Sequence, residues 1–224
     1  MPIYGKLSKA RARKSIAKGE LEGKIISRQK LLRRENTMRV LETQNEQHWL
    51  YHNTSLKKMQ SLLGINLTDL VSKRITTKPK QKPVVVDWGC SNGTAIRTLA
   101  KKFEGKAECY GVSHRTYPEW KTNRDSKKVK FVHSTANDFF RYFKDGSIDL
   151  FYAHQALLHL PNEVEYIQRV LPKLATGGKL VANLDLFNLG KYQEYTKDKM
   201  PIRMGKSIFK VESNGRAIVI TRIG

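Results

Sequence analysis

The sequence predicts an α/β fold, with an open and mostly parallel sheet preceded by a basic helical extension. Val84-Val85-Val86 is a β-branched run typical of a short buried strand, and a loop with Gly89 and Gly93 separates it from a helical segment that begins at Thr94. Strand and helix patterns then alternate along the chain. Ser213-Asn214-Gly215 finally indicates the turn of a β-hairpin. A parallel sheet that ends in an antiparallel hairpin follows from these observations.

Each element after the first strand has its own signal. Apolar and β-branched runs predict strands, and capping residues or helical spacing predict helices, as at Thr116-Tyr117-Pro118-Glu119. The predicted strands are 107–113, 129–133, 147–153, 179–184, 206–212 and 216–222. The predicted helices are 116–125, 137–143 and 161–174.

The first part of the chain has a different composition. Residues 76–83 are polar and contain two prolines, which is typical of a linker. Before them, apolar spacing predicts amphipathic helices, including 56–63 and 67–75. We therefore expect an extension with its linker over residues 1–83 and a domain over residues 84–224.

The charge of the chain is strongly positive. Lys and Arg number 42 against 20 Asp and Glu, a net charge of +22, and residues 1–83 hold 19 of the basic residues against 6 acidic ones. Such an excess favours a phosphate-rich partner, because neutralised phosphates release counterions. A solubilising surface or an amphipathic presequence are the alternatives. The expected partner is nucleic acid, RNA or the ribosome, bound by Lys6, Lys9, Arg11, Arg13, Lys14, Lys18, Lys24, Arg28, Lys30, Arg33 and Arg34.

Several classes of protein are disfavoured. Cys90 and Cys109 lie in or beside predicted strands, so neither a disulfide framework nor a zinc site is indicated. His48 and His52 have helical metal-binding spacing but no third ligand, and we expect no metal. No apolar run is long enough to cross a bilayer. The expected compartment is the cytoplasm, with the nucleus or an organelle matrix as alternatives.

The stretch Asp87-Trp88-Gly89-Cys90-Ser91-Asn92-Gly93 resembles motif I of the class I S-adenosylmethionine-dependent methyltransferases, with Ser91 in place of the middle glycine. Residues 147–160 and 170–180 resemble later parts of the same family. The resemblance implies a Rossmann-like sheet of seven strands over residues 84–224 and S-adenosyl-L-methionine as the cofactor.

The resemblance also implies a set of cofactor-binding residues at the strand ends. Two acids of the family pattern are replaced here, at Ser113 after the second strand and at Thr135 after the third. A hydroxyl accepts more weakly than a carboxylate, because charge-assisted hydrogen bonds are roughly twice as strong. The implied residues are Asp87, Trp88, Gly89, Cys90, Ser91, Asn92, Gly93, Ser113, His114, Thr135, Ala136, Asn137 and His154.

Methyl transfer requires an aligned nucleophile, and a general base helps when the acceptor loses a proton. His154 and Gln155 follow the fourth strand and are the candidate catalytic residues, although His154 could instead only hydrogen-bond near the cofactor. We expect a methyltransferase for a polyanionic substrate, with RNA, and ribosomal RNA in particular, favoured. A non-catalytic RNA- or ribosome-binding protein with a degenerate fold, and a protein or small-molecule methyltransferase, are the alternatives.

Overall fold

The computed structural model describes residues 54–135, 138–157, 160, 163–183 and 201–224. These residues belong to one compact unit, Leu50–Gly224. The residues predicted to bind nucleic acid, 6–34, and the pair His48 and His52 lie outside the described part of the chain.

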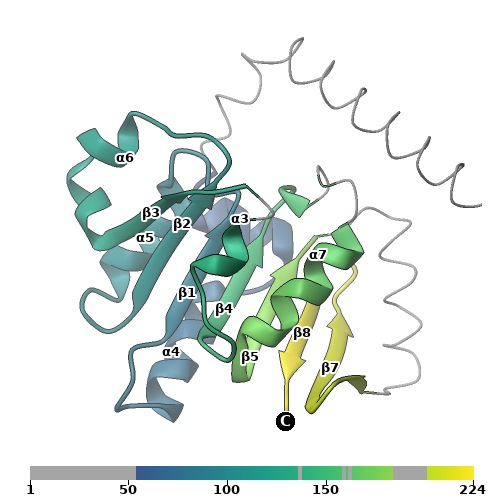
Figure 1. The fold of residues 1–224 in the computed structure, drawn as a ribbon. Coiled ribbons are helices and arrows are strands. Elements are labelled where there is room, and N and C mark those ends of the chain that lie inside the picture. Colours follow the sequence, from purple (N-terminus) through teal and green to yellow (C-terminus); the bar gives the residue numbers. More distant parts are fainter. Residues whose placement is uncertain (1–53, 136–137, 158–159, 161–162, 184–200) are drawn as a thin grey trace, which may run out of the picture. The chain divides into compact units, whose positions relative to one another are not determined.

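A single sheet forms the centre of this unit (Figure 1). The strand order is β3-β2-β1-β4-β5-β8-β7-β6, with parallel pairing from β3 to β5 and antiparallel pairing from β5 to β6. The predicted fold class is confirmed, and the sheet has 8 strands where 7 were expected. The strands are β1 (Val84–Trp88), β2 (Glu108–Ser113), β3 (Val129–His133), β4 (Ile148–Ala153), β5 (Leu174–Ala182), β6 (Ile202–Met204), β7 (Ser207–Ser213) and β8 (Ile218–Arg222).

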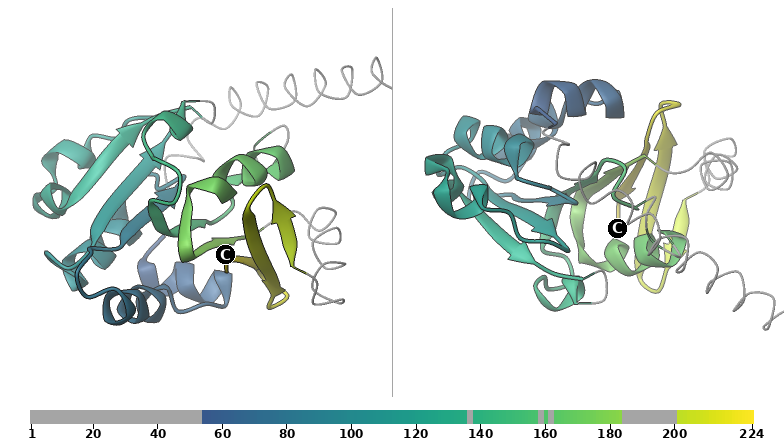
Figure 2. Two further views of the ribbon diagram at one scale, coloured as in Figure 1. Left: turned by 60° about the horizontal axis from the view of Figure 1, so that its bottom comes forward. Right: turned by 90° about the horizontal axis from the view of Figure 1, so that it is seen from above.

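Helices cover both faces of the sheet, as the two views of Figure 2 show. Alternate residues of β1 point to opposite faces, so Val85 packs with one core cluster and Val86 with the other. The first cluster includes residues from α3 (Leu56–Leu63), α4 (Leu67–Thr77) and α5 (Thr94–Lys102), and Trp120 of α6 (Glu119–Thr122) packs against it. The second lies under η2 (Phe139–Arg141), α7 (Glu163–Val170) and η4 (Leu171–Lys173).

The helices α3 and α4 are part of this core. Ser55 caps α3, which ends at Gly64 in the left-handed region, and Asn66 caps α4. Their apolar faces bury Leu63 and Leu67 completely. The domain was expected to begin at Val84, whereas the compact unit Leu50–Gly224 includes α3 and α4, whose apolar residues pack in its core. The polar stretch after α4 is a surface loop within it.

Four predicted elements differ in detail. The helix expected at 116–125 divides into α6 and the 3-10 helix η1 (Arg124–Lys128), and the one expected at 137–143 is reduced to η2. The helix expected to continue to 174 changes to η4 at Pro172, because proline lacks the N–H that an α-helix uses. The strand expected at 179 begins earlier, because Leu174 already pairs with Ile148 of β4. The register then shifts, with Gly177 at a φ of +76°, before pairing resumes at Lys179.

Candidate functional site

The carboxyl ends of the five parallel strands meet at one edge of the sheet, the upper edge in Figure 1. The strand β1 pairs with β2 on one side and β4 on the other, so the chain changes direction across the sheet at β1. Open α/β sheets bind ligands at such a switch point. The loop 89–93 lies directly after β1 and is therefore at the expected position.

The loop has three residues in the left-handed region: Gly89 at φ +78°, Ser91 at +52° and Gly93 at +85°. Gly89 is exposed to solvent, and a Cβ atom there would lie 2.2 Å from the Cβ of Ala156 in the loop after β4. Ser91 stands where the motif has its middle glycine, and a left-handed conformation costs a non-glycine residue roughly 1–2 kcal/mol. The loop therefore leaves an exposed backbone surface that a side chain at Gly89 would fill.

Hydrogen bonds hold this loop from several elements. The N–H groups of Gly89 and Cys90 donate to the carbonyl of Val112 in β2, over 2.8 Å and 3.0 Å. The indole Nε1 of Trp120 donates to the carbonyl of Ser91 over 2.9 Å. The guanidinium of Arg97 donates to the carbonyl of Asn92. The loop is thus preorganised by β2, α6 and α5.

The other predicted loop residues are packing and capping groups. Trp88 is buried against Phe139 and Tyr166, with ring centroids 5.1 Å and 5.0 Å away. Cys90 is buried, and burial raises the pKa of its thiol. The side-chain oxygen of Asn92 accepts from the N–H and the hydroxyl of Thr94, over 3.2 Å and 2.9 Å, at the start of α5.

Asp87 lies under the loop, 1% exposed, beside Tyr152 of β4. Among the described residues, neither of its carboxyl oxygens, nor the Tyr152 hydroxyl, has a hydrogen-bond partner at normal geometry. Burial raises the pKa of Asp87 to about 7, and the nearby Tyr152 hydroxyl counteracts part of that rise. An unsatisfied acid below an exposed glycine loop is a feature that a polar ligand, or a water that bridges to it, would fit.

The ends of β2 and β3 carry hydroxyl groups. Ser113 is buried, and its Oγ accepts from the N–H of Arg115 over 3.3 Å, while His114 is exposed. The hydroxyl of Thr135, which is exposed, donates to Asp138 Oδ2 over 2.8 Å. The predicted residues Ala136 and Asn137 lie outside the described residues. Sequence analysis did not assign Asp138 to the site, because it follows the strand end by five residues.

The ends of β4 and β5 complete this edge. His154 is partly buried, and Gln155 is exposed with a φ of +59°. The N–H of Gln155 donates to Asn183 Oδ1, at the end of β5, over 2.6 Å. Asn183 was missed because no local pattern relates it to Gln155, and only the pairing of β4 with β5 brings them together.

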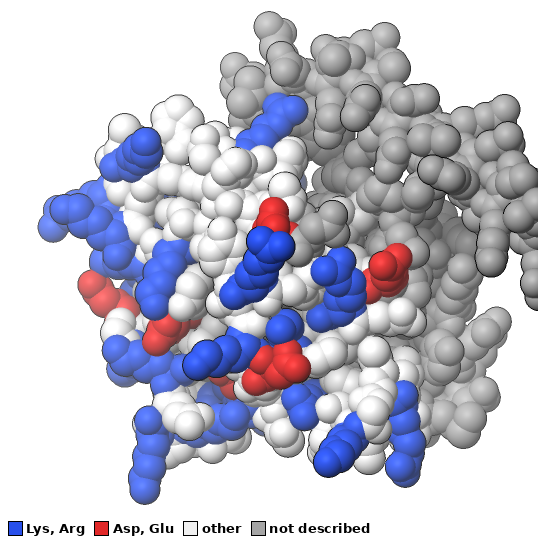
Figure 3. All heavy atoms as spheres, viewed as in Figure 1, with Lys and Arg blue, Asp and Glu red and all other residues white. Residues whose placement is uncertain are grey.

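The described residues contain no cluster of three or more His, Cys, Asp or Glu side chains suited to a metal. No helix in this part of the chain is long and apolar enough to cross a membrane. Lys and Arg side chains are distributed over the face shown in Figure 3, with Asp and Glu beside several of them.

Comparisons with known proteins agree with this arrangement. A family model described as a methyltransferase domain matches residues 86–182. The chloroplastic tocopherol O-methyltransferase of Arabidopsis thaliana is 26% identical over 113 residues, which are 48% of this chain and 32% of that protein. The chain thus spans about a third of the length of this curated relative.

Solved structures also resemble the chain. The plantazolicin methyltransferase BamL, solved with a desmethyl plantazolicin analogue and SAH, has a TM-score of 0.51 and 18% identity, over 76% of this chain and 64% of BamL. The related BpumL has a TM-score of 0.47 and 13% identity, over 80% of this chain and 68% of BpumL. The likeness to BamL supports the fold.

Proposed function

We propose that this chain, whose residues 86–182 match the methyltransferase-domain family model, transfers a methyl group from S-adenosyl-L-methionine to an acceptor held at the carboxyl edge of the sheet. The observation that carries this proposal is the left-handed glycine loop 89–93 at the switch point, with its backbone exposed at Gly89. The cofactor, when bound, supplies an electrophilic methyl group on a sulfonium.

The residues at this edge of the sheet have different proposed roles in cofactor binding, according to the strand that each one follows. The backbone from Gly89 to Gly93 would receive the amino acid part of the cofactor. Ser113, His114 and Thr135 lie where the ribose and adenine would be held, and Asp138 supports Thr135 through its hydrogen bond. This set offers hydroxyls where the family uses acids, so we expect weaker cofactor binding than a carboxylate would give.

His154 is the residue proposed to hold a proton during the reaction. It follows β4, two residues before Ala156, which lies against Gly89 of the glycine loop, and an imidazole has an unperturbed pKa near neutral. As a base it would accept the proton of the acceptor, and Gln155 would orient that acceptor through its amide. The Asn183 hydrogen bond holds the backbone that presents both side chains.

The proposed acceptor is a polyanion, with structured RNA such as ribosomal RNA favoured. The net charge of +22 and the basic residues 6–34 support this proposal. A small-molecule acceptor is the second candidate, because the tocopherol and plantazolicin methyltransferases are named for small-molecule or natural-product substrates. We propose the cytoplasm as the compartment, with an organelle matrix or the nucleus as the alternatives.

Cofactor binding is tested by calorimetry with S-adenosylhomocysteine. Gly89→Ala should weaken binding at least tenfold, because the added Cβ would lie 2.2 Å from the Cβ of Ala156. Gly105→Ala is the matched control, since Gly105 has a φ of +72° but no atom within 4 Å of an added Cβ. No heat from the wild-type protein at high micromolar ligand would instead favour the non-catalytic binding protein.

The acceptor is tested by radiolabelled methyl transfer to fractionated cellular RNA, protein and small molecules. A full-length variant with Arg11, Arg13, Lys14 and Lys18 changed to Gln should lose RNA methylation and keep cofactor binding. Label that enters only the small-molecule fraction, equally with both proteins, would reject RNA and support the second candidate.

A further inference from the structure

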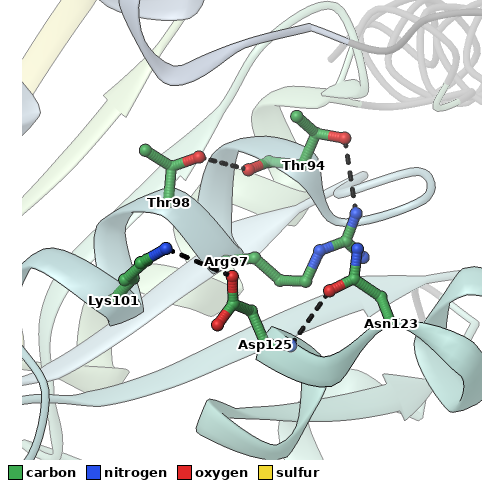
Figure 4. A pocket seen from close by; sticks show the side chains of 6 residues that line it. All are labelled: Thr94, Arg97, Thr98, Lys101, Asn123 and Asp125. Atoms are coloured by element: carbon green, nitrogen blue, oxygen red, sulfur yellow. Dashed lines mark hydrogen bonds and ion pairs between the residues drawn. The ribbon is translucent and has the colours of Figure 1, made fainter.

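A cleft of about 410 Å³ lies between α5 and the segment that begins η1 (Figure 4). None of its residues belongs to the set assigned to the cofactor. Its lining is polar and consists of Thr94, Arg97, Thr98, Lys101, Asn123 and Asp125.

Arg97 places a desolvated cation in this cleft. The residue is only 7% exposed, and burial lowers the pKa of its guanidinium. Its hydrogen bonds go to the neutral carbonyl of Asn92 and, over 3.5 Å, to the hydroxyl of Thr94. No acid within the described ranges forms an ion pair with it. Glu119 and Asp125 attract the guanidinium from beyond ion-pair distance. A buried charge without a direct ion pair is costly, so an anion in the cleft would be favoured.

Lys101 adds a second cation one helical turn later. Its side chain is 66% exposed, and its ammonium lies 3.9 Å from Asp125 Oδ2. The other carboxyl oxygen of Asp125 lies 3.7 Å from Lys128. Lys101 can therefore turn to an anion in the cleft while Lys128, which also lies 3.0 Å from Glu104, stays close to Asp125.

The amide of Asn123 is a neutral donor in the lining. The side-chain oxygen of Asn123 accepts from the N–H of Asp125 over 3.0 Å, which leaves the amide NH₂ without a partner in the described part of the chain. The hydroxyls of Thr94 and Thr98 already donate within the protein, to Asn92 Oδ1 and to the carbonyl of Thr94, over 2.9 Å each (Figure 4). Two cations with a free amide donor are groups that proteins use to hold phosphate oxygens.

We propose that this cleft binds a phosphate group, held by Arg97 and Lys101 and oriented by the amide of Asn123. The phosphate comes either from the backbone of a nucleic acid or from a free phosphate ester. Binding of a nucleic-acid phosphate rests on the proposed RNA-directed function, whereas binding of a free phosphate ester is independent of it.

Two probes test the proposal on the full-length protein without cofactor: inorganic phosphate, followed by amide NMR at Thr98 and Lys101, and a labelled short single-stranded RNA, followed by fluorescence anisotropy at several salt concentrations. Lys101→Ala should weaken phosphate binding several-fold and, if RNA occupies the cleft, reduce the salt slope of RNA binding by about 0.7. Lys102→Ala is its matched control, because Lys102 is exposed on the same helix and does not line the cleft.

Asp125→Asn is expected to change the affinity for phosphate in the opposite direction. Removal of the one acid in the cleft should tighten phosphate binding several-fold, whereas Asp145→Asn, which removes an exposed acid outside the cleft, should not. Effects on phosphate but not on RNA would assign a free phosphate ester, and effects on both would assign a nucleic-acid backbone.

The proposal is overturned if phosphate does not shift these amides, or if Lys101→Ala and Lys102→Ala change binding equally. Because neither measurement involves the cofactor, this outcome is distinct from a failure of methyl transfer.

Discussion

The indole of Trp120 donates a 2.9 Å hydrogen bond to the carbonyl of Ser91, while its ring stacks on Phe131 with a centroid distance of 4.8 Å. A side chain of α6 thus holds the middle of the glycine loop, and the core of the sheet holds that side chain.

Trp120→Phe should therefore weaken S-adenosylhomocysteine binding about five- to tenfold, because a net hydrogen bond contributes about 1 kcal/mol. The phenyl ring keeps the stacking on Phe131, so the midpoint of urea unfolding should change little. Tyr117→Phe, which only removes a hydroxyl beside the same indole, is the control. Equal affinity of the Phe variant and the wild type in calorimetry would show that this bond does not organise the loop.

The stability of the domain should depend on the ionisation of Asp87. Burial raises its folded pKa to about 7 from an unfolded value near 4. At a pH between these two pKa values, Asp87 is ionised in the unfolded state and protonated in the folded state. The free energy of unfolding therefore falls as pH rises through this range. The total loss is about 4 kcal/mol at 1.36 kcal/mol for each pH unit.

The comparison of wild type and Asp87→Asn in urea unfolding at pH 5 and pH 8 isolates this group. Asn cannot ionise, so the wild type should lose several kcal/mol more than the variant over this range. Parallel pH profiles of the two proteins would contradict a buried acid with a raised pKa.

Asn183 is expected to act as a positioning residue. Asn183→Ala removes the acceptor of the Gln155 N–H, so methyl transfer should slow about tenfold while S-adenosylhomocysteine affinity stays within twofold. Asn183→Asp retains an acceptor oxygen and should restore most of the rate. Single-turnover transfer of labelled methyl groups measures the effect, and a variant that loses affinity and rate together would point to a merely structural role.

Arg74 fastens α4 to the opposite edge of the sheet through Asp149, and the two side chains are 12% and 10% exposed. Asp149 also accepts from the N–H of Val84 over 2.9 Å. Arg74→Ala should lower the free energy of unfolding by about 3 kcal/mol, because it leaves a largely buried carboxylate without its main partner. Lys78→Ala, which removes a cation 3.8 Å from the same carboxylate, should cost under about 0.5 kcal/mol in denaturant unfolding.

Local signals along the chain were enough for the order and type of the elements. The β-branched run of β1 and the Asn214-Gly215 turn are short-range features, and their strands were placed within a residue or two. The predicted glycine loop also lies at the expected strand end. A continuous apolar run bounded by turn residues indicates where a buried parallel strand begins and ends.

The sequence by itself determined the α/β class, the glycine loop and the excess of positive charge, since each depends on residue types within a short window. Only the tertiary structure brought Asn183 to Gln155, Trp120 to Ser91 and Arg97 to Asn123. It also placed α3 and α4 in the core rather than in a separate extension. These relationships depend on strand order and on helix packing, which join residues far apart in the chain and leave no local pattern.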